Sequence, residues 1–89
     1  MLTIVSMDQI RFGDAGELGQ IVRRARRAQR LTQEELALAA GVGRGVVQKL
    51  ERGRGLVRLD SALAILAALS LDVRLVARGA IDLEPGEEG

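Results

Sequence analysis

The chain contains no cysteine and no histidine. Without cysteine it forms neither a disulfide nor a thiolate metal site, and without histidine it lacks the commonest metal ligand and general base. Most enzyme classes are therefore excluded, and neither a cofactor nor a metal site is expected. No apolar run approaches the roughly 18 residues needed to span a bilayer, and residues 1–6 are too few for a signal-peptide core. A soluble, cytoplasmic protein without membrane contacts is expected.

Charge is distributed unevenly along the 89 residues, although the formal net charge is only +1. Residues 23–58 carry ten basic side chains, nine of them arginine, against three acidic ones, which leaves a net charge of +7 in this segment. Such an excess favours a polyanionic partner, and the planar guanidinium group suits phosphates and guanine edges. A solvated arginine-rich face is the alternative explanation.

Capping residues, glycines and apolar spacing predict four helices. Asp14 and Glu17 form a capping-box pattern in front of an amphipathic segment, and Thr32 and Glu35 repeat the pattern. Gly41 follows the second of these segments, where a glycine readily adopts the left-handed conformation that ends a helix. The predicted helices span residues 15–30, 33–40, 44–52 and 59–70.

The fourth predicted helix and the segment after it indicate a homodimer. Apolar residues cover more than one face of residues 59–70, yet a domain this small has a single core, so the second face is expected to contact another subunit. Residues 71–78 alternate between mostly apolar and mostly polar positions, which predicts a half-buried strand. This strand is expected to pair with the same strand of a second chain, or alternatively with residues 3–5 of its own chain. The residues expected at the dimer interface are Leu66, Leu69, Leu71, Val73 and Leu75.

Residues 32–52 carry the pattern of a helix-turn-helix unit. Two predicted helices flank a short turn at Gly41, and the small side chain of Ala37 stands where the helices must cross closely. The apolar residues expected to hold the two helices together are Leu36, Ala37, Val42, Val47 and Leu50. An ordinary helical hairpin is the alternative, but it leaves the agreement between capping boxes, turn glycine and basic face unexplained.

The residues of this unit resemble a known family. The run LTQEELALAAGV over residues 31–42, followed by VQKLERG over residues 47–53, is similar to the XRE (Cro/C1-type, lambda-repressor-like) helix-turn-helix family. The resemblance implies an all-α domain of four to five helices, with a C-terminal strand that pairs across a homodimer. Residues 59–69 and 71–75 look most like HipB-type antitoxins, which implies an autoregulated two-gene operon and a complex with a HipA-like kinase toxin. The chain is accordingly divided into an N-terminal arm (1–13), a DNA-binding domain (14–70), a dimerisation strand (71–78) and an acidic flexible tail (79–89).

In this family the third helix lies in the major groove and the N-terminus of the second helix faces phosphate. Carried onto this chain, the resemblance implies that the residues contacting bases are Arg44, Gly45 and Gln48. Arg44 suits guanine O6 and N7, whereas Gln48 either pairs with adenine or is an exposed helix residue without a DNA contact. Gly43 and Gly45 depart from the family pattern, which has larger polar residues there. The residues expected to bind phosphate are Thr32, Gln33, Lys49, Arg52 and Arg54. A flanking phosphate contact is a further alternative for Arg23, Arg26 and Arg27 on the first helix.

Together, these observations predict a non-enzymatic transcriptional repressor that binds a pseudo-palindromic operator in double-stranded DNA as a homodimer. The expected role is the autoregulating antitoxin of a HipBA-like toxin–antitoxin operon. A stand-alone phage-type or metabolic repressor without a toxin is the first alternative. A protein-interaction adaptor that does not bind DNA is the second.

Overall fold

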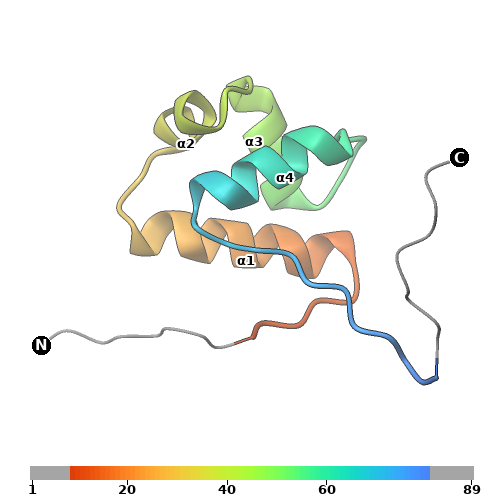
Figure 1. The fold of residues 1–89 in the computed structure, drawn as a ribbon. Coiled ribbons are helices and arrows are strands. Elements are labelled where there is room, and N and C mark those ends of the chain that lie inside the picture. The colour runs from red at the N-terminus through yellow and green to blue at the C-terminus, as the bar shows by residue number, and fades with distance from the viewer. Residues whose placement is uncertain (1–8, 81–89) are drawn as a thin grey trace, which may run out of the picture.

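Four helices make up the part of the chain that the computed structural model describes, residues 9–80. They are α1 (Ala15–Ala28), α2 (Gln33–Ala40), α3 (Arg44–Arg52) and α4 (Leu59–Ala68). In Figure 1, α1 runs along one side of the domain and the other three helices lie over it. Because α3 contacts each of the other helices, its orientation depends on all of them. The all-α, four-helix arrangement predicted from the sequence is confirmed.

Side-chain caps start α1 and α2 at the residues that the sequence predicts. The Asp14 carboxylate accepts a hydrogen bond from the backbone N–H of Glu17 at 2.8 Å. Thr32 and Glu35 form a complete capping box, in which the Thr32 N–H donates to Glu35 Oε1 at 2.9 Å and the Glu35 N–H donates to Thr32 Oγ1 at 3.0 Å. The hydrogen bonds from the backbone and hydroxyl of Thr32 lower the pKa of the Glu35 carboxyl group.

Both α1 and α4 end two residues earlier than the sequence predicts. Each helix is followed by a non-glycine residue in the left-handed conformation, Arg30 with φ of 59° and Ser70 with φ of 61°. The next backbone N–H, that of Leu31 or Leu71, donates back into the last turn of its helix at 3.1 Å or 2.8 Å. A glycine usually occupies such a position, so these two helix ends have no signal in the sequence.

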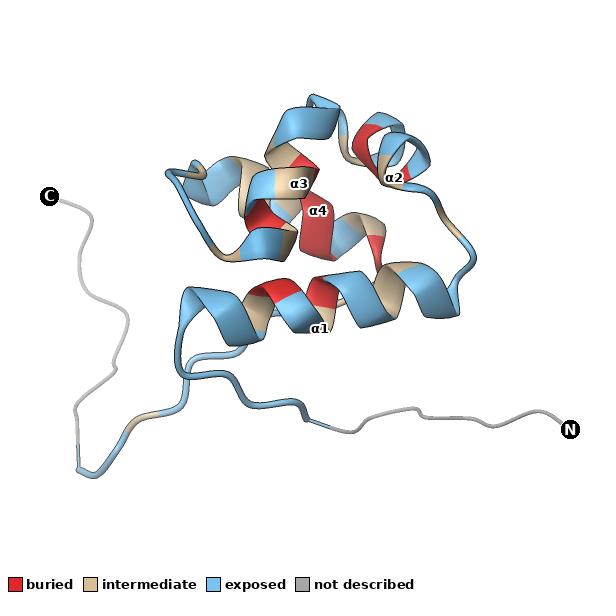
Figure 2. Ribbon diagram, turned by 180° about the vertical axis from the view of Figure 1, so that it is seen from behind, coloured by how far each residue is buried: buried red, intermediate tan, exposed pale blue. Residues whose placement is uncertain are grey.

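Aliphatic side chains form a core between the helices. Figure 2 shows the buried positions on the sides of the helices that face one another. The buried hydrophobic residues are Val22, Leu36, Ala37, Val47, Leu50, Ile65, Leu66 and Leu69. Val42, the remaining residue predicted to join α2 to α3, is half-buried and packs against this cluster. None of the helices in the described range has the length and apolar character that crossing a bilayer requires.

Two glycines allow α1 to lie directly against the C-terminal end of α3. A Cβ atom on Gly19 would lie 2.5 Å from the carbonyl oxygen of Glu51 and closer still to that of Leu50. A Cβ atom on Gly53, which has a φ of 66°, would lie 2.6 Å from the Cα atom of Gly16. No side chain fits between the two backbones at these points, so direct backbone contact sets the position of α3 relative to α1.

Residues 71–78 form no strand in the single chain, in contrast to the sequence prediction. After α4 the described chain continues to residue 80 without regular secondary structure. Alternation identifies an amphipathic segment but does not supply the neighbouring strand that its backbone groups need. The alternative pairing partner, residues 3–5, lies outside the described residues, as do residues 1–8 of the predicted arm and residues 81–89 of the predicted tail.

The residues expected at the dimer interface divide into two groups. Leu66 and Leu69 are buried in the core of one chain, with Leu69 only 2% exposed, so they do not form the second apolar face expected for α4. Leu71 is half-buried and packs against the core. Val73 and Leu75 lie on the surface, and Leu75 is 92% exposed. The exposed large apolar residues of α4 are Leu59 and Leu63 instead.

Candidate nucleic-acid interface

A tight turn joins α2 to α3. Gly41 ends α2 with a φ of 71°, and the N–H of Val42 donates to the carbonyl oxygen of Ala37 at 3.0 Å. Gly43 then starts α3 with an extended backbone and provides no side-chain hydrogen bond to the first turn. The first N–H groups of a helix have no partner within the helix, so the N-terminal end of α3 presents unpaired donors at the surface.

The residues expected to contact bases lie at this end of α3. Arg44 and Gly45 are exposed in the first turn, and Gln48 is half-buried one turn later. Arg44 and Gln48 stand on one side of the helix because residues four apart are neighbours. Nothing lies within 4 Å of a Cβ atom placed on Gly43 or Gly45. This end of the helix is therefore open on its outer side.

The residues expected to bind phosphate lie at two places beside α3. Thr32 and Gln33 stand at the N-terminus of α2, where unpaired N–H groups and the helix dipole favour an anion. Lys49 and Arg52 are exposed in the last turn of α3, and Arg54 is exposed in the loop that follows. The first place lies against α3 at Glu51, to which the side chain of Gln33 donates, and the second is the C-terminal end of α3 with the loop after it.

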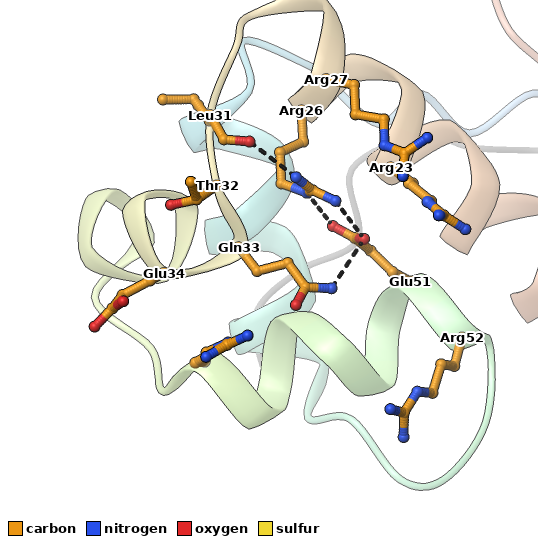
Figure 3. Close-up of a pocket in the computed structure, with 10 residues that line it drawn as sticks. Arg23, Arg26, Arg27, Leu31, Thr32, Gln33, Glu34, Glu51 and Arg52 are labelled. Carbon is orange, nitrogen blue, oxygen red and sulfur yellow. Dashed lines mark hydrogen bonds and ion pairs between the residues drawn. The ribbon is translucent and has the colours of Figure 1, made fainter.

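A part-buried ion pair ties α1 to α3 beneath this surface (Figure 3). Arg26 donates to both carboxylate oxygens of Glu51, from Nε at 2.6 Å and from Nη2 at 3.1 Å, and the two side chains are 11% and 4% exposed. Arg26 Nη1 also donates to the carbonyl oxygen of Leu31 at 2.8 Å, and Gln33 Nε2 donates to Glu51 Oε1 at 3.2 Å. The hydrogen bond and the charge of Glu51 raise the pKa of the Arg26 guanidinium group. One carboxylate therefore connects three helices.

This network changes how two expected phosphate ligands are understood. Arg26 is a structural partner of Glu51 and is not a free cation on the first helix. The side-chain amide of Gln33 donates inward to Glu51, so its backbone N–H is the group left to face an anion. Sequence reasoning missed Glu51, although it is the only acidic residue of α3. Arg26 follows the buried Val22 by four residues and so lies on the same side of α1, which was a usable signal.

A hollow of about 660 Å³ opens between α1, the start of α2 and α3. Five arginines and two glutamates line it, together with Leu31, Thr32 and Gln33. The structure thus brings together four of the predicted DNA-contacting residues, which are Thr32, Gln33, Arg44 and Arg52. Lys49 and Arg54 instead line a smaller, mostly apolar cavity of about 240 Å³ next to α4. Gly45 and Gln48 line neither cavity.

A tight helix-turn-helix unit with an exposed basic face defines a DNA-binding regulator, and this class of protein is not enzymatic. Residues 22–76 match the helix-turn-helix family, and the chain belongs to that family as a member of its XRE type. The prediction of a helix-turn-helix transcriptional regulator that binds DNA is thereby confirmed.

Two known proteins and one complex illustrate the similarity. The chain is 33% identical over 69 residues to an uncharacterized HTH-type transcriptional regulator, y4mF, of Sinorhizobium fredii, and the match covers 78% of this chain and 91% of that protein. It is similar to the restriction-modification controller protein C.AhdI from Aeromonas hydrophila, with a TM-score of 0.60 and 36% identity over 65% of this chain and 88% of that one. A chain in the structure of a HipA–HipB–O2–O3 complex has a TM-score of 0.71 and 21% identity over 80% of this chain and 100% of its own, which shows a shared fold.

Proposed function

We propose that this regulator is a repressor that binds a specific, pseudo-palindromic DNA site as a homodimer and blocks transcription by occupying a promoter. The observation that supports this proposal most directly is the charge around α3. Arg26 and Glu51 neutralise each other, so four further arginines in the hollow stand against Glu34 alone. An exposed helix next to such a cationic surface has the shape and charge to enter the major groove between two phosphate backbones.

In the proposed complex, Arg44 and Gln48 contact the edges of the bases. Arg44 is exposed and forms no ion pair within residues 9–80, so its guanidinium group is available for guanine O6 and N7. The amide of Gln48 suits adenine N6 and N7. Gly45, between them, brings only its backbone, which allows the helix to approach the base pairs closely. Specificity is expected to depend mainly on Arg44.

The remaining contacts in the proposed complex fix the position of α3 in the groove. Thr32 and the backbone of Gln33 would bind a phosphate at the N-terminus of α2. Lys49, Arg52 and Arg54 would bind phosphates near the other end of α3. Contacts of this kind add affinity for all sequences alike, because phosphates carry no base identity.

The proposed homodimer forms through residues 71–78, which pair with the same residues of a second copy as antiparallel strands. Support comes from the surface of the single chain: Val73, Leu75 and Val76 are exposed apolar residues, and Leu71 attaches the segment to the core. Pairing would satisfy the backbone groups of the segment and cover these side chains. In this proposal residues 14–70 are the DNA-binding domain, residues 1–13 an arm and residues 79–89 an acidic tail.

We further propose that the regulator is the autoregulating antitoxin of a HipBA-like operon and binds a HipA-like kinase toxin. The shared fold with the chain from the HipA–HipB–O2–O3 complex motivates this role. The likeness to the controller protein C.AhdI, at higher identity, favours a second candidate, a regulator without a toxin. Co-expression with the product of the adjacent gene distinguishes them: a stable complex with a kinase-like protein supports the antitoxin, and the absence of such a neighbour supports the second candidate.

Selection of DNA from a random pool, followed by binding measurements on two variants, tests the repressor proposal. Arg44→Ala is expected to cost about 1 to 3 kcal/mol and to relax the preference at one guanine, because it removes a bidentate base contact. Arg52→Ala is expected to weaken all sequences alike. Equal, uniform losses in both variants would contradict these roles, and failure to enrich any DNA sequence would contradict the proposed function.

Truncation after Ser70 tests the dimer. Without residues 71–89 we expect a monomer with much weaker operator binding, because each half-site must then be bound separately. Sedimentation velocity gives the oligomeric state of both forms. An unchanged dimer after truncation would contradict the role of residues 71–78, and a monomeric full-length chain at micromolar concentration would contradict the homodimer.

A further inference from the structure

Two arginines on α1 lie outside the helix-turn-helix unit but face the same hollow. Arg23 and Arg27 are exposed, stand one helical turn apart and line the hollow with Arg52 of α3. In Figure 3 all three side chains lie on the same side of the Arg26–Glu51 ion pair. None of the three forms a salt bridge with a residue in the range 9–80.

The charges around these arginines are not balanced within the described chain. Glu51 is the carboxylate nearest in the hollow, and it already accepts hydrogen bonds from Arg26 and Gln33. Glu34 lies on α2 at the other side of the hollow (Figure 3). Like charges four residues apart on a helix repel each other, so Arg23 and Arg27 together make the isolated domain less stable. An anion bound between α1 and the end of α3 would remove this cost.

The position of the hollow indicates which anion it meets. Its lining continues from Arg23 and Arg27 to Thr32 and Gln33 at the start of α2 and to Arg44 at the start of α3. Any DNA backbone that reaches the N-terminus of α2 therefore also runs along the mouth of the hollow. Arginine is suited to a phosphate at this place because its planar group donates two parallel hydrogen bonds.

We propose that Arg23 and Arg27 of α1, with Arg52 of α3, bind the DNA backbone phosphate next to the one held by the N-terminus of α2. The protein then contacts DNA with three helices, and its footprint on one strand extends beyond the helix-turn-helix unit. This inference rests on the proposed function, because it requires α3 to lie in the major groove. It assigns a role to α1 that the charge count and the helix-turn-helix pattern leave open.

The salt dependence of binding tests the assignment. For B-DNA the slope of log Kobs against log salt concentration is about −0.9 per neutralised phosphate, so the loss of this one phosphate contact makes the slope shallower by about 0.9. We expect the double variant Arg23→Gln/Arg27→Gln to bind the selected operator more weakly at low salt. The ratio of wild-type to variant affinity should shrink roughly threefold between 50 and 200 mM chloride, because about one counterion fewer is released.

A matched control removes the same number of charges from positions away from the hollow. Arg11 and Arg24 are exposed and do not line it. The double variant Arg11→Gln/Arg24→Gln should keep the wild-type slope and most of the affinity. An equal effect in both double variants would show only a long-range influence of net charge and would overturn the assignment. The preferred base sequence should be the same for the wild type and both variants, because phosphate contacts do not select bases.

Two further measurements separate the sources of failure. If the wild type binds operator DNA and Arg44→Ala loses specificity while Arg23→Gln/Arg27→Gln leaves the slope unchanged, the proposed function stands and this inference fails. Inorganic pyrophosphate tests the free-anion source of the same chemistry. A rise in Tm with pyrophosphate, measured at constant ionic strength and lost in Arg23→Gln/Arg27→Gln, would assign the hollow to a soluble anion and overturn the DNA assignment. No such rise is expected.

Discussion

Alanine in place of two helical glycines should change stability in opposite directions. In a helix interior, alanine is favoured over glycine by about 1 kcal/mol because glycine loses more backbone freedom on folding. Gly45 in α3 has open space around it, so Gly45→Ala should gain about 0.5 to 1 kcal/mol. Gly19 in α1 has no such space, because the carbonyl groups of Leu50 and Glu51 occupy the position of the new atom.

The size of the loss at Gly19 follows from this geometry. A Cβ atom there would lie 2.5 Å from the Glu51 oxygen, and the obstacle is backbone that cannot rotate away. Inserting a methyl group into a packed contact costs about 1 to 3 kcal/mol, and the rigid obstacle places this case at about 3. After the helix-propensity gain of about 1 kcal/mol is subtracted, Gly19→Ala should lose about 2 kcal/mol.

Thermal unfolding followed by circular dichroism at 222 nm measures both effects. In a domain of this size, 1 kcal/mol corresponds to about 4 to 8 °C, so Gly19→Ala should lower Tm by roughly 8 to 16 °C. Gly45→Ala should raise Tm by roughly 2 to 8 °C. A Tm for Gly19→Ala equal to or above that of the wild type would refute the close contact between α1 and α3. Gly45→Ala is the control, because it makes the same glycine-to-alanine change where no backbone lies in the way.

Three further predictions concern the ion pair, a cap and a helix end. Glu51→Ala should cost about 1 to 3 kcal/mol in urea denaturation because it leaves the part-buried Arg26 guanidinium without its partner. Arg26→Met/Glu51→Leu should lose less than the sum of the single variants. The pKa of the Glu35 carboxyl group is lowered in the folded state. Its ionised form therefore stabilises the fold above the ordinary pKa of 4.5, and this stabilisation is lost as the pH falls through the lower pKa of the folded state. Glu35→Gln should remove this part of the pH dependence of Tm. Ser70→Gly should gain about 1 kcal/mol because Ser70, just after α4, has a left-handed backbone, whereas Ala67→Gly inside α4 should lose about 1 kcal/mol, both measured by urea denaturation.

The sequence was sufficient for features that depend on neighbouring residues. Capping by Asp14 and Thr32, the left-handed Gly41 and the small Ala37 are local requirements of helices and turns, and each was found where it was predicted. The lengths of α1 and α4 were overestimated because Arg30 and Ser70 adopt a conformation that their residue types rarely adopt.

Features that depend on how helices pack were not accessible in the same way. The Arg26–Glu51 ion pair joins residues 25 apart in sequence. The spacing from Val22 places Arg26 on the buried side of α1, but it does not show that Glu51 of α3 is its partner. Leu66 and Leu69 were assigned to a subunit contact because an apolar helix surface does not reveal which side the chain itself covers. The exposed side is that of Leu59 and Leu63, which becomes evident only when α4 is placed on the other helices.

The two ends of α3 are held in different ways, and this separates the residues that stabilise the fold from those proposed to read DNA. The C-terminal end is fixed by the Gly19 and Gly53 contacts with α1 and by the Glu51 carboxylate. The N-terminal end has no side-chain cap and is open around Gly43 and Gly45. Substitutions at residues 43–45 therefore change the exposed surface of the proposed DNA-contacting end without disturbing the core. Under the proposed contacts, a lineage that carries this scaffold can acquire new operator sequences by mutating these positions, while the residues that maintain the fold stay unchanged.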